Sequence, residues 1–211
     1  MADEVTVVPA GATPGPDLDT LAIGERLREA REAQHLGLRE LARRVSVSPS
    51  FVSQIERGLA SPSVATLYSI VSELNLSLDE LFSGVAAPDA TERASSPVLR
   101  ASDRRIIHLA SGVRWERLTP DPEPDVDFLY AVYEVGGASS PDELLIRHTG
   151  KEYGIVLEGR LGLTVGPDTW ELDPGDSVSF DSTTPHRLWA VGEEAAVVVW
   201  FVAGRRDEIA H

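Results

Sequence analysis

The hydrophobic pattern of this 211-residue chain changes its period once, and that change decides what it can fold into. Apolar residues recur at helical spacing over residues 21–82 and in short strand-like runs over residues 105–211. A Pro- and acid-rich stretch occupies residues 1–20, and small and polar residues dominate 83–104. We therefore expect a disordered tail, an all-α domain, a linker and an all-β domain, in that order.

Charge is distributed unevenly between these two domains. The formal net charge is −15, from 19 basic and 34 acidic side chains, whereas a nucleic-acid-binding surface should be basic. In residues 21–82 seven Arg nearly balance eight acids, while residues 105–211 carry nine bases and nineteen acids. The helical domain is nearly neutral, so it remains able to bind nucleic acid. Because it has few excess positive charges, we expect its nonspecific affinity for nucleic acid to be modest.

Several classes of protein are excluded by composition. The chain has no Cys, which excludes disulfides and Cys-ligated metal centres. It shows neither a signal peptide nor an apolar run of about 18 residues. We therefore expect a cytoplasmic protein with no membrane partner.

The first domain is expected to form five helices. The clearest has Ser48 as N-cap, Pro49 at its first position, and Gly58 just beyond its end near residue 57. Ser61-Pro62 repeats this start signal for a fourth helix. Its apolar stripe has helical spacing: Val64, Leu67, Val71 and Leu74. The remaining helices are expected over about 21–34, from 38 to about 45, and over 78–82.

The helix that starts at Pro49 has a buried side, Val52 and Ile55, and an opposite side that is free. The free side carries hydroxyl, amide and guanidinium groups: Ser50, Ser53, Gln54 and Arg57. Such groups suit the major groove of DNA, where Gln pairs with adenine and Arg with guanine. Phosphate contacts are expected from amide groups at two helix starts and from two Arg side chains: Ser48, Ser61, Arg39 and Arg43.

Residues 23–82 resemble the phage-repressor-like (XRE-type) helix-turn-helix domain in the stretches IGERLREAREAQHL, LRELARRVSVSPSFVSQIERGLASPSVATLYSIVSEL and LSLDELF. In that family the third helix reads DNA, which implies that Gln54 is the main base-reading residue. Two positions depart from the family pattern. Ser46 replaces the usual turn Gly, at a cost of about 1–2 kcal/mol if its φ is positive, and Gly37 replaces a Ser or Thr cap. A bundle used only for dimerisation is the alternative.

The second domain shows short strands separated by Gly and Pro, a pattern typical of a double-sheet, jelly-roll barrel. The run AAVVVWFV predicts a strand buried on both faces. Strands are expected over 105–109, 113–118, 128–135, 143–147, 153–158, 160–165, 168–172, 176–180, 186–191 and 195–203.

Three residues of this domain are candidate metal ligands: His148, Glu152 and His186. Two imidazoles and a carboxylate make a facial set for one divalent ion, Fe, Mn, Zn or Ni, with positions left open for a ligand. Three nearby aromatic residues are candidates for lining a small-molecule pocket: Tyr153, Phe180 and Trp189. A metal-free polar pocket explains the same residues equally well.

The stretches RHTGKEYGIVLEGRLGLTVG and ELDPGDSVSFDSTTPHRLW resemble the two motifs of the cupin family. The resemblance implies that His148, Glu152 and His186 are three of its four usual ligands. Ile146 occupies the position of the fourth, which excludes a four-ligand protein site.

A helix-turn-helix followed by a cupin resembles the bacterial cupin-containing transcriptional regulators. This resemblance implies a homodimer on a pseudo-palindromic DNA operator, with a small-molecule effector bound by the cupin and no catalytic residues. The alternative is a mononuclear non-haem iron oxygenase or epoxidase, because hydroxypropylphosphonic acid epoxidase has the same domain order and a similar ligand set. A storage cupin is a third interpretation.

Overall fold

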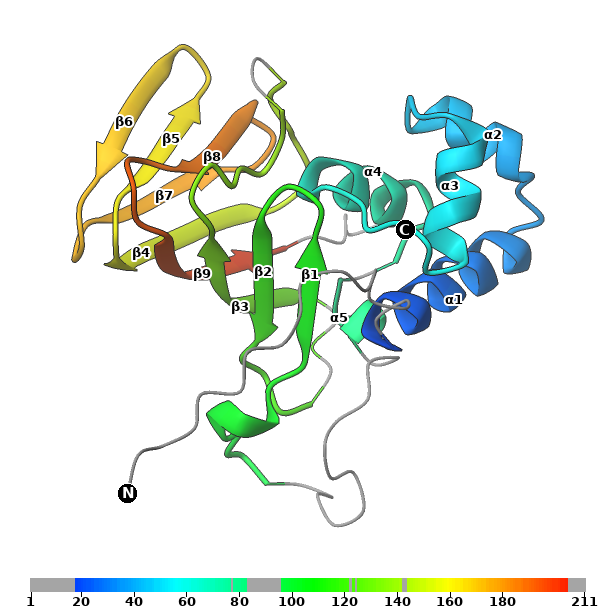
Figure 1. Cartoon of the computed structure of the whole chain (residues 1–211), viewed down its shortest axis with the longest axis horizontal. Coiled ribbons are helices and arrows are strands. Elements are labelled where there is room, and N and C mark those ends of the chain that lie inside the picture. The colour runs from blue at the N-terminus through cyan, green and yellow to red at the C-terminus, as the bar shows by residue number, and fades with distance from the viewer. Residues whose placement is uncertain are drawn as a thin grey trace, which may run out of the picture.

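A computed structural model describes residues 18–76, 78–82, 96–121, 123, 125–141 and 144–204. The helices gather on one side of the molecule and the strands form the other (Figure 1). The predicted tail lies almost wholly outside the described residues, as does most of the predicted linker. The described end of that linker contains one short 3₁₀ turn, Ala101–Asp103.

In the described part of the chain the helical region has four helices of seven residues or more, rather than five. They are α1 (Leu18–Ala33), α2 (Leu38–Arg44), α3 (Pro49–Glu56) and α4 (Val64–Glu73). The expected fifth, α5 (Leu78–Phe82), is little more than one turn long. The predicted stripe of α4 is buried, with every member at most 2% exposed. The alternation of apolar and polar residues therefore predicted the core side of α4 correctly.

The α2–α3 connection has the backbone that the sequence predicts. Ser46 adopts a φ of 57°, the left-handed conformation that favours Gly. Gly37 precedes α2 as its N-cap without a side-chain hydrogen bond. Ser48 caps α3, since its Oγ accepts a hydrogen bond from the Phe51 amide at 3.2 Å.

The predicted start of α4 is wrong by two residues. Ser63, rather than Ser61, is the N-cap, and its Oγ accepts a hydrogen bond from the Thr66 amide. Ser61 and Pro62 instead bind the β region: Ser61 Oγ donates to the His108 carbonyl, and the Pro62 carbonyl accepts from the Ala110 amide. Ser61 is therefore not a helix terminus and offers no helix-end amides to phosphate.

Within the described residues, nine strands form two sheets. They are β1 (Ile106–Leu109), β2 (Val113–Arg117), β3 (Val126–Tyr133), β4 (Lys151–Glu158), β5 (Leu161–Val165), β6 (Asp168–Leu172), β7 (Ser177–Asp181), β8 (His186–Ala190) and β9 (Ala196–Ala203). The larger sheet has the order β1-β2-β3-β9-β4-β7 and the smaller has β6-β5-β8. All pairs are antiparallel, as a jelly-roll barrel requires.

Two strand predictions are wrong. Residues 144–147 are irregular apart from a single bridge from Ile146 to His186, because the Leu144 amide and carbonyl bond back to Pro141 and Ser140. β9 is not buried on both faces, since Val199 and Phe201 are only half-buried. Neither residue is covered by a second layer in the described part of the chain, so this face of the large sheet is open.

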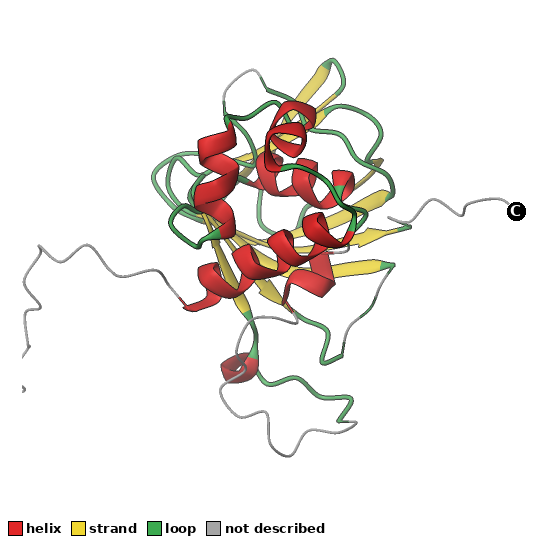
Figure 2. Cartoon of the chain, turned by 90° about the vertical axis from the view of Figure 1, so that its right-hand side faces the viewer, coloured by secondary structure: helices red, strands yellow, loops and turns green. Residues whose placement is uncertain are grey.

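The two regions share one hydrophobic core. Buried residues of α1 and α4 belong to the same apolar cluster as those of β1, β2 and β3. Tyr68 of α4 meets Trp115 of β2 edge-on, with ring centroids 5.6 Å apart. Figure 2 shows the helices lying over the strands from the side on which they pack. The helical region is therefore held against the barrel by packed side chains as well as by the chain connection.

Candidate DNA-binding surface and metal centre

α3 presents the polar face that the sequence predicts. Val52 and Ile55 are each 1% exposed and anchor the helix, whereas Ser50, Gln54 and Arg57 are exposed and Ser53 is half-buried. None of the three exposed side chains is covered by the barrel. The helix therefore has one side in the core and the other available to a partner.

The flanking groups are less free than their residue types suggest. Arg43 is exposed but pairs with Glu40 through two hydrogen bonds of 2.6 and 3.0 Å. Glu40 also binds Arg44, and the hydrogen bonds from Arg43 and Arg44 lower the pKa of Glu40 to about 2. Arg39 is exposed. Arg43 must therefore exchange a carboxylate for a phosphate if it contacts DNA.

A buried ion pair that the sequence analysis missed fixes α3 against α1. Arg31 Nε and Nη2 donate to the two carboxylate oxygens of Glu56 at 2.6 and 2.9 Å, and Arg31 Nη1 donates to the Leu36 carbonyl at 2.9 Å. The two side chains are only 10% and 5% exposed. Gly24 permits the close contact, because a Cβ there would lie 2.3 Å from the Ile55 carbonyl oxygen. The pair thus sets the orientation of the exposed face.

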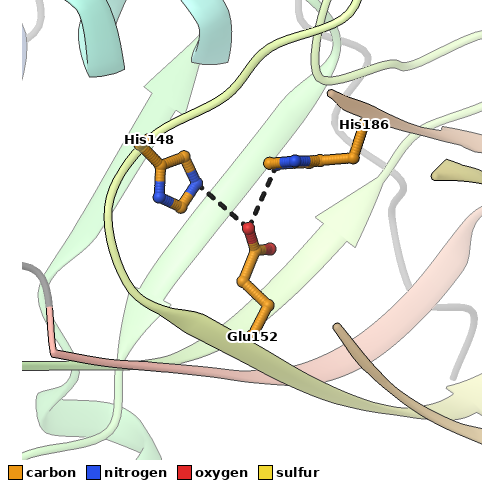
Figure 3. Close-up of side chains that lie close together, drawn as sticks. All are labelled: His148, Glu152 and His186. Atoms are coloured by element: carbon orange, nitrogen blue, oxygen red, sulfur yellow. Dashed lines mark ion pairs between the residues drawn. The ribbon is translucent and has the colours of Figure 1, made fainter. Parts of the chain in front are cut away.

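The three predicted metal ligands meet inside the barrel (Figure 3). His148 Nε2 lies 3.0 Å from Glu152 Oε1, and His186 Nε2 lies 3.1 Å from the same oxygen. Their side chains are at most 3% exposed. The fold brings them together because β4 carries Glu152, β8 begins at His186, and the Ile146–His186 bridge places the segment with His148 beside β8.

Hydrogen bonding determines which atoms of the two imidazoles face the centre. His148 Nδ1 lies 3.0 Å from the Thr149 carbonyl and His186 Nδ1 lies 2.9 Å from the Thr184 carbonyl. A carbonyl only accepts, so each Nδ1 carries a proton, and in the neutral form of either ring the Nε2 lone pair points inward. Two lone pairs then face Glu152 Oε1, and within the described part of the chain no donor reaches these three buried atoms when both rings are neutral.

Such a set of acceptors requires a cation, either protons or a metal. Two ligand atoms at right angles around an ion, each about 2.1 Å from it, lie about 3.0 Å apart. This separation matches the distances from Glu152 Oε1 to His148 Nε2 and to His186 Nε2. The residues therefore fit a divalent metal ion. In the metal-free protein, burial raises the pKa of Glu152, but hydrogen bonds with the two imidazoles lower it by more. The pKa of Glu152 is therefore well below its usual range. Burial lowers the pKa of His186, and Glu152 more than reverses that effect.

Two side chains around the cluster were not predicted. Trp200 Nε1 donates to Glu152 Oε2 at 2.6 Å, which orients the carboxylate from outside the ligand set. Tyr68 stacks on His148, with ring centroids 4.4 Å apart. Both contacts join distant parts of the chain, and no local pattern indicates them.

Only one of the three aromatic residues predicted to line the pocket lies near the His–Glu–His cluster. Phe180 lies near the cluster, with its ring centroid 5.0 Å from that of His186. Tyr153 is 42% exposed on the outer face of the large sheet, and Trp189 is half-buried beneath Arg187 on the outer face of the small one. Tyr153 follows Glu152 directly and Trp189 stands three residues after His186, so strand alternation sends each to the opposite face. Neither lines the cluster.

Comparisons with known proteins agree with both halves of this architecture. Residues 27–81 match a helix-turn-helix family model and residues 129–202 match a cupin domain model. HTH-type transcriptional regulator PuuR of Escherichia coli is 30% identical over 168 residues, covering 79% of this chain and 86% of that protein. The chain belongs to this family of HTH-type transcriptional regulators. It is a DNA-binding regulator that carries a cupin domain.

Further relatives match most of the chain. HTH-type transcriptional regulator SutR of Escherichia coli is 28% identical, covering 80% of this chain and 86% of that protein. The crystal structure of an HTH_3 family transcriptional regulator from Vibrio cholerae aligns with a TM-score of 0.65 and 26% identity, over 90% of this chain and 98% of that one. Among the described residues no helix has the length and apolar character needed to cross a membrane.

Proposed function

We propose that two copies of this regulator bind a pseudo-palindromic DNA operator through α3, and that the cupin holds a metal ion and a small-molecule effector. The observation that carries the proposal is the two-sided α3, anchored by Val52 and Ile55 while Gln54 and Arg57 stay exposed. Gln54 reads an adenine and Arg57 a guanine in the major groove, with Ser50 and Ser53 beside them. The operator lies in the cytoplasm, where such a regulator acts.

Phosphate contacts position α3 on the duplex. At the start of α3 the Ser50 amide is the group offered to a phosphate by the positive end of the helix dipole, because Pro49 has no N–H and the Phe51 and Val52 amides bind Ser48. Arg39 and Arg43 supply two further contacts, the second after release from Glu40. So few cationic groups predict a shallow dependence of affinity on salt concentration.

The open face of the large sheet supports pairing with a second copy. Three β4 side chains on it are 41–42% exposed: Tyr153, Ile155 and Leu157. They continue into half-buried apolar residues of the neighbouring strands, Val199 and Phe201 on β9 and Phe128 and Tyr130 on β3. A self-complementary pairing of this face covers the patch and produces the two-fold symmetry of a palindromic operator, with the two α3 helices about 34–36 Å apart.

The metal is a single Fe, Mn, Zn or Ni ion held by His148, Glu152 and His186. Three protein ligands leave coordination positions for a donor atom of the effector, and the buried site selects for size. An effector alters operator binding only to the extent that it binds the DNA-bound and free arrangements differently. We propose that residues 21–82 are the DNA-reading domain, 83–104 the linker and 105–211 the sensor domain. The tail expected over 1–20 is three residues too long, because α1 already begins at Leu18.

Selection of bound duplexes from a random DNA pool by the purified protein tests the reading role of α3. Gln54→Ala should lose about 1–3 kcal/mol of binding at one base pair and relax specificity there. Ser72→Ala changes an exposed residue near the end of α4 and serves as the matched control. If Gln54→Ala binds the selected operator as tightly and selectively as wild type does, base reading by Gln54 is refuted.

An iron-dependent oxygenase or epoxidase is the second candidate, because two His and one Glu can hold iron. Metal analysis followed by measurement of oxygen uptake with iron(II) separates the two. Uptake that depends on an added organic compound would favour the enzyme. Operator binding without turnover would favour the regulator.

A further inference from the structure

The ring of Tyr68 lies where the DNA-binding helices meet the metal centre. Tyr68 belongs to α4 and is 6% exposed. Its ring is parallel to that of His148 within 4°, with centroids 4.4 Å apart, and its edge packs against Trp115. The helical region thus places one of its own side chains directly on a candidate metal ligand.

Backbone hydrogen bonds hold α4 at this position. The Ala65 amide, in the first turn of α4, donates to the Ser139 carbonyl at 2.9 Å. The Ala110 amide donates to the Pro62 carbonyl at 3.0 Å, just before the helix. These two bonds, the bond from Ser61 Oγ to the His108 carbonyl and the Tyr68–His148 stack lie in the seam between helices and barrel. Access to the cluster from this side requires the seam to open.

A metal ion changes the strength of this contact. Coordination through Nε2 withdraws electron density from the His148 ring and gives it partial positive charge. The face of a Tyr ring carries the negative part of the aromatic quadrupole and attracts a more positive ring. Stacking is therefore stronger with the metal bound, and by reciprocity the docked helix strengthens metal binding by the same factor.

We propose that Tyr68 is an outer wall of the metal centre, through which a metal bound by His148, Glu152 and His186 tightens docking of the DNA-binding helices on the barrel. The proposal rests on the metal-binding part of the proposed function. The effect reaches the reading helix because Arg44 of α2 bonds Glu73 of α4 at 2.5 Å, and α2 packs against α3. Metal occupancy thereby strengthens the contacts that hold α3 in its position relative to the barrel.

The test uses the full chain, Co²⁺ as the probe, and the variants Tyr68→Phe and Tyr68→Leu. Co²⁺ binding is followed by visible absorption, and docking by hydrogen exchange at the Ala65 and Ala110 amides. Tyr68→Phe keeps the ring and should bind Co²⁺ within about twofold of wild type. Tyr68→Leu should bind it about 2- to 10-fold more weakly, as expected for loss of one aromatic pair. Co²⁺ should slow exchange at both amides in wild type and Tyr68→Phe, but not in Tyr68→Leu.

Equal Co²⁺ affinity of Tyr68→Leu and wild type would overturn the proposal. So would unchanged exchange at both amides when wild type binds Co²⁺, a result that needs no variant and holds even if Tyr68→Leu fails to fold. If wild type takes up no Co²⁺, the metal site and this inference fall together. Failure of wild type to select any operator would refute DNA reading by α3 while leaving both measurements, and the inference, intact.

Discussion

The buried Arg31–Glu56 pair offers a sharp test of how α3 is held. In Arg31→Met the Glu56 carboxylate stays 5% exposed with no cationic partner, and the Leu36 carbonyl loses a donor. Removing one member of a buried ion pair costs about 3–5 kcal/mol, because a charge is left without compensation. A domain of ordinary stability, about 5–15 kcal/mol, survives this loss but unfolds at much lower denaturant concentration.

Urea unfolding measures the change with two probes. Circular dichroism reports the helices, while fluorescence reports the barrel, because all four Trp lie in residues 105–211. The double variant Arg31→Met/Glu56→Leu removes the stranded charge and should recover at least half of the loss. A loss below about 1 kcal/mol in Arg31→Met, or a double variant less stable than the single one, would refute the reasoning.

Three other outcomes follow from the geometry. Ser46→Gly should raise the free energy of unfolding by about 1 kcal/mol, measured by urea unfolding, because Gly adopts the φ of 57° without strain. Trp200→Phe should weaken Co²⁺ binding about 10- to 100-fold in a titration, since Glu152 loses its orienting donor. The pKa of His186 is raised, because Glu152 outweighs burial; its contribution to stability is complete below pH 6.5 and is lost as pH rises through the raised value. Metal-free protein should therefore unfold at lower urea concentration at pH 8 than at pH 6, and bound Zn²⁺ should remove this difference.

Local signals predicted the parts of the fold that local chemistry determines. Ser48, Pro49 and Gly58 placed α3 within one residue of its observed end, because capping groups act on their own turn. The same kind of signal misplaced the start of α4, since Ser61 and Pro62 give their polar groups to the barrel. A tertiary contact thus overrode a start signal that was chemically sound.

The cluster of three candidate ligands was predictable from the sequence, but its surroundings were not. His148, Glu152 and His186 stand in motif spacing, whereas Trp200 and Tyr68 reach them only through sheet pairing and docking of α4. The alternation of side chains along a strand is readable from the sequence, and it places Tyr153 and Trp189 on the face opposite the pocket. The Arg31–Glu56 pair left no sequence signal, because Arg and Glu are common on exposed helix faces and only the packed structure shows these two buried.

The apolar core that runs without a break from α1 and α4 into β1 and β2 limits how this protein can be recombined. A helical region expressed without the barrel would expose to water the surfaces that Ile107 and Trp115 now cover. Fusing the helical region to a different domain would require a matching apolar surface on that domain as well as a linker of suitable length. Changes to the interior of the existing barrel should therefore preserve this protein better than an exchange of whole domains.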